Sequence, residues 1–466
     1  MNWALTHLSA VAAGVAFVLV AMSVLRQHRT PQSAFAWLLF VALIPYLGVP
    51  AFIALGARKT LPARSLMSFA DAGRRAPGGP GALEAGALPA MSAAIERLAI
   101  SAGLPQASSG NRVELIASGE AAYRQLVAIV EEASHCVDLT FYKFADDSVG
   151  RDIAIRLARR ARQGVRVRLL LDGYGSRPKP HAALRELQES GGELRIFSPL
   201  SEAPIRGHIN LRNHRKMAVG DRRRVFAGGA NIALEYMGPT ALAERWVDLT
   251  FHVEGPCVGS YAAMFEADWR RAGRGRSAMP ADAAEPVRAG DAIVQLLPSG
   301  PDIEHDVLHD ALVLACHQTR RRILIVTPYF LPSQALADAL SIAARRGVDV
   351  RLIVPARSNQ RVADLGRASF LREAREAGVN VLAHPGMVHA KAMVFDDCGF
   401  AGSANFDVRS LFINFESMLV LHSAAEVGAL ALWAEELARR CSHWRPADGL
   451  GARLGERLFR LAAPLM

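Results

Sequence analysis

The chain has 466 residues, 51% of them hydrophobic, and a formal net charge of +10 at pH 7. This length allows two or three domains, and the positive charge suits an anionic partner, either nucleic acid or an anionic membrane. The five cysteines are scattered without a CxxC pair, which argues against a disulfide framework and a cysteine-based zinc site.

Two apolar segments open the chain. The first runs from Trp3 to Leu25 with one ionisable side chain, and the second from Ala34 to Ala57 with none. Each could cross ~30 Å of hydrocarbon as a helix, and a second segment after the first favours a retained hairpin over a cleaved signal peptide. Pro45 and Pro50 should kink the second helix, with a re-entrant path as the alternative. We therefore predict a membrane anchor over residues 1–58.

A linker is predicted over residues 59–110, because this segment is rich in Ala, Gly and Pro. Basic residues follow the second apolar segment, including Arg58, Lys59 and Arg64. This bias favours a main body on the cytoplasmic side of a cell membrane.

An α/β pattern occurs twice after the linker. A buried strand, a helix and a second strand are predicted in each copy, at 137–144, 148–163 and 165–171 and again at 322–328, 333–346 and 348–354. The sequence Ala161-Arg-Gln-Gly-Val-Arg-Val-Arg-Leu-Leu is similar to Ala344-Arg-Arg-Gly-Val-Asp-Val-Arg-Leu-Ile, at the same place in the second unit. The sequence thus predicts an internal duplication, with halves at 111–285 and 286–466 and one site at the seam between them.

Each half contains the pattern H-x-K-x4-D. The residues are His214, Lys216 and Asp221 in the first half and His389, Lys391 and Asp396 in the second. Histidine and lysine are two positions apart, so they share one face of a strand. An ammonium is a compact charge suited to holding a phosphate oxygen beside the imidazole, and only five of the 54 basic residues are lysine.

Each motif leads into a turn of small residues, within the motif regions 209–236 and 384–411. The turns contain Gly229 and Asn231 in the first half and Ser403 and Asn405 in the second. Small residues let backbone N–H groups and the asparagine amide approach a phosphate. Gly229 lacks the hydroxyl that Ser403 supplies, and the second motif is one residue shorter between its aspartate and Gly402.

A nucleophilic histidine needs an acidic partner that fixes its tautomer. Asp248 lies downstream of His214, and Glu416 lies downstream of His389 at a comparable separation. From this matched spacing we expect each carboxylate to serve the histidine of its own half.

The duplicated motif resembles the phospholipase D superfamily, and the wider sequence is similar to bacterial cardiolipin synthases. The similar stretches are 30–37, 210–216, 298–301, 327–332 and 405–416. This resemblance implies an α/β fold with two phospholipase D-like α/β/α sandwich halves around one active site, preceded by a transmembrane helical hairpin. It implies no cofactor and no metal.

The same resemblance implies the chemistry. One phosphatidylglycerol would transfer its phosphatidyl group to another, giving cardiolipin and glycerol through a phosphohistidine. His214 would attack phosphorus and His389 would protonate the leaving glycerol, while the two lysines and two asparagines stabilise the phosphoryl oxygens. Asp221 and Asp396 would hold the motifs together. The partners would be anionic phospholipids and the bilayer, with no nucleic acid, and phosphatidylethanolamine as donor is left open.

Three other interpretations compete with this one. A phosphodiesterase of the same fold could hydrolyse lipid or nucleic acid. A zinc hydrolase could use His305 and His309, which have helical i, i+4 spacing but lack the glutamate of HExxH. A membrane scaffold without activity would not require two intact motifs. We also expect residues 453–466 to form an amphipathic helix, lying either on an anionic membrane or on the core.

Overall fold

The computed structural model describes residues 3–24, 31–56, 81, 83, 86–199, 210–273, 287–303 and 305–446. The expected C-terminal amphipathic helix at 453–466 and residues 57–80 of the anchor and linker region lie outside the described residues.

Three helices form the N-terminal region: α1 (Trp3–Val24), α2 (Pro31–Leu43) and α3 (Pro45–Leu55). The prediction of one kinked helix over 34–57 is wrong, because the segment consists of two helices that meet at Ile44. Ile44 has an extended φ of −137°, and Pro45, which lacks an N–H, begins the new helix. Pro50 lies inside α3.

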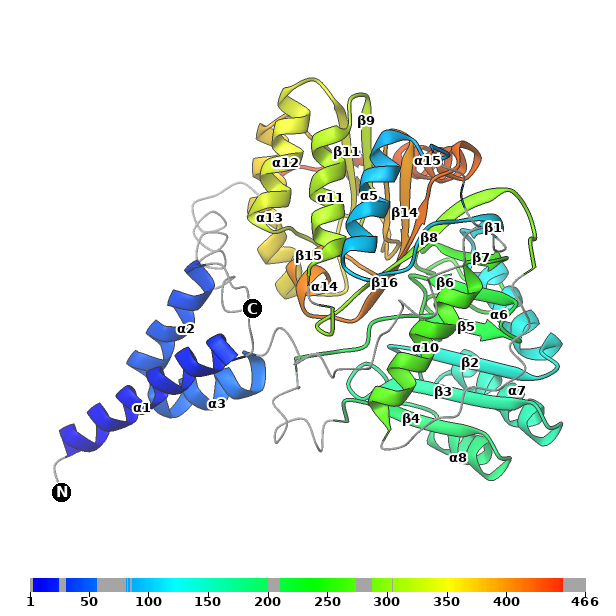
Figure 1. Ribbon diagram of the computed structural model, residues 1–466, viewed down its shortest axis with the longest axis horizontal. Coiled ribbons are helices and arrows are strands. Elements are labelled where there is room, and N and C mark those ends of the chain that lie inside the picture. The colour runs from blue at the N-terminus through cyan, green and yellow to red at the C-terminus, as the bar shows by residue number, and fades with distance from the viewer. Residues whose placement is uncertain are drawn as a thin grey trace.

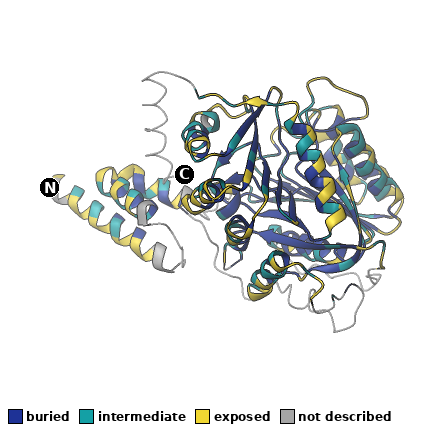
Figure 2. Cartoon of the chain, turned by 90° about the horizontal axis from the view of Figure 1, so that it is seen from above, coloured by how far each residue is buried: buried dark blue, intermediate teal, exposed yellow. Residues whose placement is uncertain are grey.

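The three N-terminal helices share a small core and expose many apolar side chains. Val18, Trp37, Val41 and Phe52 are buried together. The exposed set comprises Trp3, Leu8, Phe35, Leu43, Tyr46 and Leu47 among others. Among the residues described, none of the helices combines the length and the hydrophobicity that crossing a membrane requires. Figures 1 and 2 show these helices to one side of the α/β body.

The first half of the body contains seven strands. Its elements are β1 (Ser108–Ile116), α6 (Gly119–Glu132), β2 (Cys136–Phe141), α7 (Ser148–Arg162), β3 (Arg166–Asp172), α8 (His181–Glu189), β4 (Glu193–Phe197), β5 (Met217–Gly220), β6 (Arg224–Gly228), β7 (Thr250–Glu254) and α10 (Val258–Ala272).

The second half repeats this order. Its elements are β8 (Ala292–Ser299), α11 (Val307–Gln318), β9 (Arg322–Val326), β10 (Phe330–Leu331), α12 (Gln334–Arg345), β11 (Asp349–Pro355), α13 (Arg361–Glu376), β12 (Asn380–His384), β13 (Ala392–Phe395), β14 (Cys398–Gly402), β15 (Phe406–Asp407), α14 (Val408–Phe412), β16 (Glu416–Leu421), α15 (Ala424–Ala438) and β17 (Ser442–His443). Before both halves, α5 (Ala90–Ser101) packs on α11, so part of the segment expected to be a linker is helical.

One mixed sheet of 15 strands joins the halves. At its centre β1 pairs antiparallel with β8. Outward from β1 the order is β7, β6, β5, β2, β3, β4, and outward from β8 it is β16, β14, β13, β9, β11, β12, β17. The order is therefore the same on both sides, with β17 added at one edge.

Alternation along the strands separates two cores, because successive side chains point to opposite faces. In β3, Leu169 and Leu171 join the core beneath α6, α7 and α8, whereas Leu170 joins the core beneath α10. The inner strands are largely buried, as Figure 2 shows in dark blue, whereas the edge strands β4 and β17 are mostly partly or fully exposed.

The motif aspartates lie in the hairpin turns of both halves. Asp221, between β5 and β6, accepts hydrogen bonds from the backbone N–H groups of Ser134, His135 and Cys136 at 2.7, 2.7 and 2.9 Å. Its φ is 50°, in the left-handed region that Asp and Asn tolerate better than most residues. Each turn is thereby tied to the start of the neighbouring strand.

Asp396 repeats this arrangement between β13 and β14. It accepts from the N–H groups of Arg320, Arg321 and Arg322 at 2.7, 3.0 and 2.9 Å, with φ at 47°.

We expect Asp221→Asn and Asp396→Asn each to lower the free energy of unfolding by about 1.5–3 kcal/mol, since a neutral amide replaces a carboxylate that accepts three N–H bonds. Asparagine retains the backbone preference, so the change isolates the charge. Denaturation of the detergent-solubilised chain measures the effect. The control is Asp397→Asn, at an exposed neighbouring position. Unchanged stability in both motif variants would contradict this structural role.

Candidate active site

The two motif segments lie at seams where one half contacts the other. In the first seam, residues 212–214 pair with 415: His214 N donates to Phe415 O at 2.9 Å, and Phe415 N donates to Arg212 O at 2.9 Å. In the second seam, residues 387–389 pair with 247: Val247 N donates to Met387 O at 2.9 Å, and His389 N donates to Val247 O at 2.7 Å. In both, the residue before an acid bridges the residue before a histidine.

These bridges determine which carboxylate meets which histidine. His214 Nδ1 lies 2.9 Å from Glu416 Oε1, and His389 Nδ1 lies 2.8 Å from Asp248 Oδ2. The expectation that each acid serves the histidine of its own half is wrong. The partners are crossed because the residue directly before each acid forms a backbone bridge to the residue directly before the histidine of the other half.

The crossed pairs fix the tautomer of both rings. An ionised carboxylate can only accept, so each Nδ1 carries the proton and each Nε2 keeps its lone pair. Although burial favours the protonated acid, contact with the histidines holds the pKa of both Glu416 and Asp248 below the ordinary value.

The lysines lie against the histidines. Lys216 Nζ donates to His214 O at 2.5 Å. Lys391 Nζ donates to His389 O and lies 3.0 Å from His389 Nε2. Both lysines are almost completely buried. Lys391 also lowers the pKa of His214, and Lys216 that of His389, so each ammonium acts on the histidine of the other half.

Burial sets the protonation of this cluster. It lowers the pKa of His214 to about 4 against the opposing effect of Glu416, and with Lys391 it lowers the pKa of His389 to about 3. It also lowers the pKa of Lys391 to about 8 and moves that of Lys216 well below its ordinary value. Burial therefore keeps both imidazoles neutral and disfavours the charged form of both lysines, and an added anion would stabilise that charged form.

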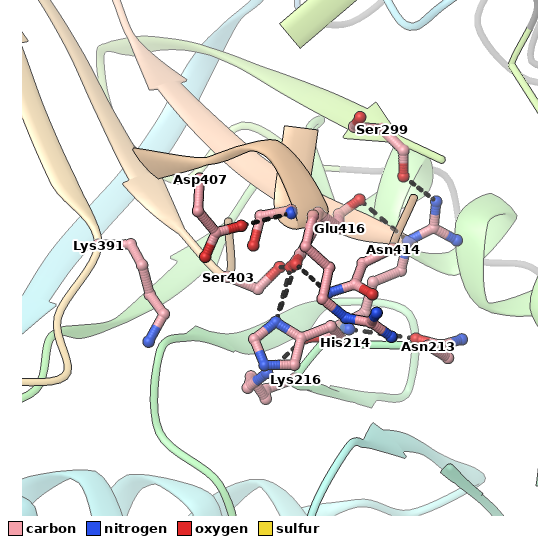
Figure 3. A network of polar contacts seen from close by, with 12 residues as sticks. Asn213, His214, Lys216, Ser299, Lys391, Ser403, Asp407, Asn414 and Glu416 are labelled. Carbon is pink, nitrogen blue, oxygen red and sulfur yellow. Dashed lines mark hydrogen bonds and ion pairs between the residues drawn. The ribbon is translucent and has the colours of Figure 1, made fainter. Parts of the chain in front are cut away.

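The small-residue turn of the second half supports Glu416. Ser403 Oγ donates to Glu416 Oε2 at 2.5 Å, and Asn414 Nδ2 donates to Glu416 Oε1 at 3.3 Å. Figure 3 shows these side chains converging on the carboxylate above His214.

Gly229 holds the corresponding place in the first half. A Cβ atom there would lie 2.0 Å from Asp248 Oδ1. The carboxylate that bonds His389 therefore occupies the space that a serine side chain would need. The hydroxyl missing at this position is accompanied by an acid one methylene shorter than Glu416.

The two motif asparagines are both buried, and they differ in their contacts. Asn231 Oδ1 accepts from Lys143 N at 3.1 Å, and its amide also contacts Tyr236. Asn405 Oδ1 has no hydrogen-bond partner among the described residues. Asn405 thus retains hydrogen-bonding capacity toward a ligand.

Aromatic residues that sequence reasoning missed line both histidines. The ring of Tyr142 meets His214 edge-on at 4.8 Å between centroids. Tyr236 and Trp246 contact His389 at 4.9 and 5.8 Å. Tyr142 lies in the predicted strand 137–144, and Trp246 lies two residues before the candidate acid Asp248, so the positions of both aromatic residues gave a usable signal.

The alternative zinc site is not assembled. His309 Nε2 lies 2.8 Å from Ser333 Oγ, and its ring contacts Phe412. Within the described parts of the chain, no group of three His, Cys, Asp or Glu side chains could hold a metal ion.

Comparison with known proteins extends this description. A family model described as "Cardiolipin synthase, PLD-like domain" matches residues 126–269 and 312–438, and one described as "Phospholipase_D-nuclease N-terminal" matches residues 15–56. Among solved structures, phosphatidylserine synthase of Haemophilus influenzae has a TM-score of 0.57 at 14% identity, covering 75% of this chain and 92% of that one. That likeness shows the fold alone.

Curated relatives are similar over nearly the whole chain. Cardiolipin synthase A of Pseudomonas entomophila is 31% identical, over 96% of each chain. Cardiolipin synthase of Geobacillus kaustophilus is 30% identical over 96% of this chain and 92% of its own, and cardiolipin synthase A of Pseudomonas aeruginosa is 30% identical over 94% and 91%. With both motifs, a continuous duplicated sheet and this similarity, the chain belongs to the cardiolipin synthase family of phospholipase D-like proteins.

Proposed function

We propose that this protein is a cardiolipin synthase, a phosphatidyltransferase that joins two phosphatidylglycerol molecules and releases glycerol. The observation that carries the proposal is the pair of crossed histidine–carboxylate contacts between the halves, with a buried lysine against each histidine. Two neutral Nε2 atoms beside two buried lysines suit attack on an anionic phosphodiester and the later departure of the histidine from phosphorus.

In the first step, His214 Nε2 attacks phosphorus and forms a P–N bond. The P–O bond to the leaving glycerol breaks, and that oxygen takes a proton from His389. The phosphate anion offsets the charge of Lys216 and Lys391, which otherwise lower the pKa of His389, so substrate binding favours the protonated acid. Glu416 stabilises the positive charge that develops on His214.

In the second step, His389 accepts the proton of a glycerol hydroxyl on another phosphatidylglycerol. That oxygen attacks phosphorus, the P–N bond breaks, and cardiolipin is released with His214 restored. The lysines and Asn231 and Asn405 stabilise the phosphoryl oxygens in both steps, while Ser403 holds Glu416, Gly229 makes room for Asp248, and Asp221 and Asp396 anchor the turns.

The proposed site of action is the surface of a cell membrane. The exposed apolar side chains of α1, α2 and α3 support insertion of these helices into a bilayer, although the break at Ile44 divides the second apolar segment into two short helices. We propose that this unit anchors the enzyme and that its body faces the cytoplasm. Anchoring gives the phosphohistidine a high local concentration of lipid alcohols relative to free substrate.

A second candidate function is hydrolysis of the same phosphodiester, in which water replaces the lipid alcohol in the second step. Mass spectrometry of lipids from a host lacking cardiolipin, expressing this chain or His214→Ala, separates the two. Cardiolipin supports the synthase, phosphatidic acid in its place supports hydrolysis, and no change from the His214→Ala profile contradicts both.

We expect His214→Ala and His389→Ala each to reduce cardiolipin formation by at least about 10³-fold, since each removes a reacting group. A phosphatidyl p-nitrophenyl ester then separates their roles, because its leaving group needs no proton. His389→Ala should still release a stoichiometric burst of p-nitrophenol, and His214→Ala should not. The reverse pattern would make His389 the nucleophile. The matched control is His443→Ala at an exposed position.

Activity should fall on the alkaline side of about pH 8. Lys391 is charged below its pKa of about 8 and neutral above it, so kcat/KM should decline as the pH rises through this value. Bound phosphate favours the ammonium, so the decline in kcat should lie at higher pH. In Lys391→Arg, whose cation does not titrate here, the alkaline decline should vanish even at a reduced rate. A decline that persists in this variant would assign it to another group.

Gly229→Ala should lower kcat by about 10- to 10²-fold, because the added methyl group displaces the Asp248 carboxylate from His389. The control is Gly259→Ala on α10, where an added Cβ meets no atom within 4 Å. Kinetics in mixed micelles measures both. An unaltered kcat for Gly229→Ala would show that Asp248 can move without loss of function.

A further inference from the structure

Arg215, between the histidine and lysine of the first motif, connects three parts of the fold. Its side chain is completely buried. The guanidinium donates to Asp268 Oδ1 on α10 at 2.5 Å, to Ser299 O at the end of β8 at 3.2 Å and to Glu416 O on β16 at 3.1 Å. One side chain thus links a helix of the first half to two strands of the second.

Asn213 completes the arrangement. Asn213 Nδ2 donates to Asp268 Oδ2 at 2.9 Å, and Asn213 Oδ1 accepts from Arg215 N at 3.1 Å. Both oxygens of Asp268 are therefore engaged by residues that flank His214. Asn213, Arg215 and Asp268, which we call the clamp, are each at most 1% exposed.

Burying this charge pair is costly, because both ions lose hydration. The fold of the motif does not itself require a buried arginine. In the second motif the position that corresponds to Arg215 is occupied by Ala390, which is also buried. The His389 segment forms the same backbone bridge across its seam with an alanine there. The clamp is thus an asymmetric addition beneath one histidine.

We propose that the clamp is a positioning device for Glu416. Arg215 holds the carbonyl group of Glu416 itself, while the side chain of that residue meets His214 Nδ1. The guanidinium therefore fixes the main chain from which the carboxylate reaches the ring. This inference rests on the proposed function, in which His214 is the nucleophile. Attack on phosphorus is the step that depends most on the orientation of the histidine ring.

Among the described residues, no hydrogen bond or ion pair joins the clamp side chains to Lys216 or Lys391, so loss of the clamp should alter the chemical step more than substrate binding. A displacement of about 1 Å at a reacting group can cost about 10²-fold in rate. We therefore expect an effect on kcat with little change in KM.

A second buried arginine, which also pairs with an acid of α10, offers a matched control. Arg168 of β3 is equally buried, and it pairs with Asp138 at 2.7 Å and with Glu266 of α10 at 2.6 Å. These ion pairs lie within the first half. Loss of Arg168 should cost stability through α10 without altering the His214–Glu416 contact.

The test compares Arg215→Met/Asp268→Leu with Arg168→Met/Asp138→Leu, using the full-length enzyme in phosphatidylglycerol micelles. In the control, Glu266 keeps Arg222 as an ion-pair partner at 3.5 Å. The first pair removes the charges of the clamp together and leaves no unpaired buried ion. We expect kcat per folded molecule to fall about 10²-fold with KM within about twofold for the clamp variant, and to stay within about threefold for the control. Arg215→Lys should recover part of kcat, because it restores a cation beside Asp268.

Equal kcat losses in the two double variants, or a clamp variant that loses only thermal stability, would overturn the proposal. Glycerol release and cardiolipin formation are recorded in parallel. A parent enzyme that releases glycerol without forming cardiolipin would contradict the synthase function alone, since the clamp would still be tested by the rate of glycerol release.

Discussion

The crossed contact between each histidine and an acid from the other half is the constraint on which the rest of the site depends. Main-chain bonds at the two seams place residues 247 and 388, and residues 213 and 415, side by side. Asp248 and Glu416 come directly after the bridged residues 247 and 415 in the chain, so each bridge also places an acid beside a histidine. Neither half alone contains a histidine with its carboxylate, so the continuous sheet through β1 and β8 is part of the active site as well as of the fold.

Charge is the second organising feature. Two lysines and two carboxylates lie in a region almost closed to water, where desolvation changes the pKa of every member. The imidazoles stay neutral because burial and the adjacent ammonium groups both oppose a further positive charge. A bound phosphodiester anion stabilises the charged form of the lysines, which burial alone disfavours.

Much of this arrangement was readable in the sequence, because duplication and motif spacing are local signals. The repeated strand–helix–strand units follow from periodicity. The prediction that His214 and Lys216 share the face of a strand is wrong, because both residues precede β5. The partners of the histidines do not follow from periodicity, because a comparable separation along the chain says nothing about which strand ends meet across a seam. The prolines predicted a kink, whereas the chain breaks into two helices at Ile44. The absence of a side chain at Gly229 is explained only by the fold, which brings the Asp248 carboxylate against this residue.

The edge-to-edge union of β1 with β8 has a consequence for substrate access. Many two-lobed enzymes open by rotation about a flexible connection, but here the lobes share one hydrogen-bonded sheet and two further seams beside the reacting groups. Rotation of one lobe against the other would separate both histidines from their acids. A lipid must therefore reach the two histidines through movement of side chains and loops at the rim of the site. The contacts between the histidines and their acids then persist while product is exchanged for substrate.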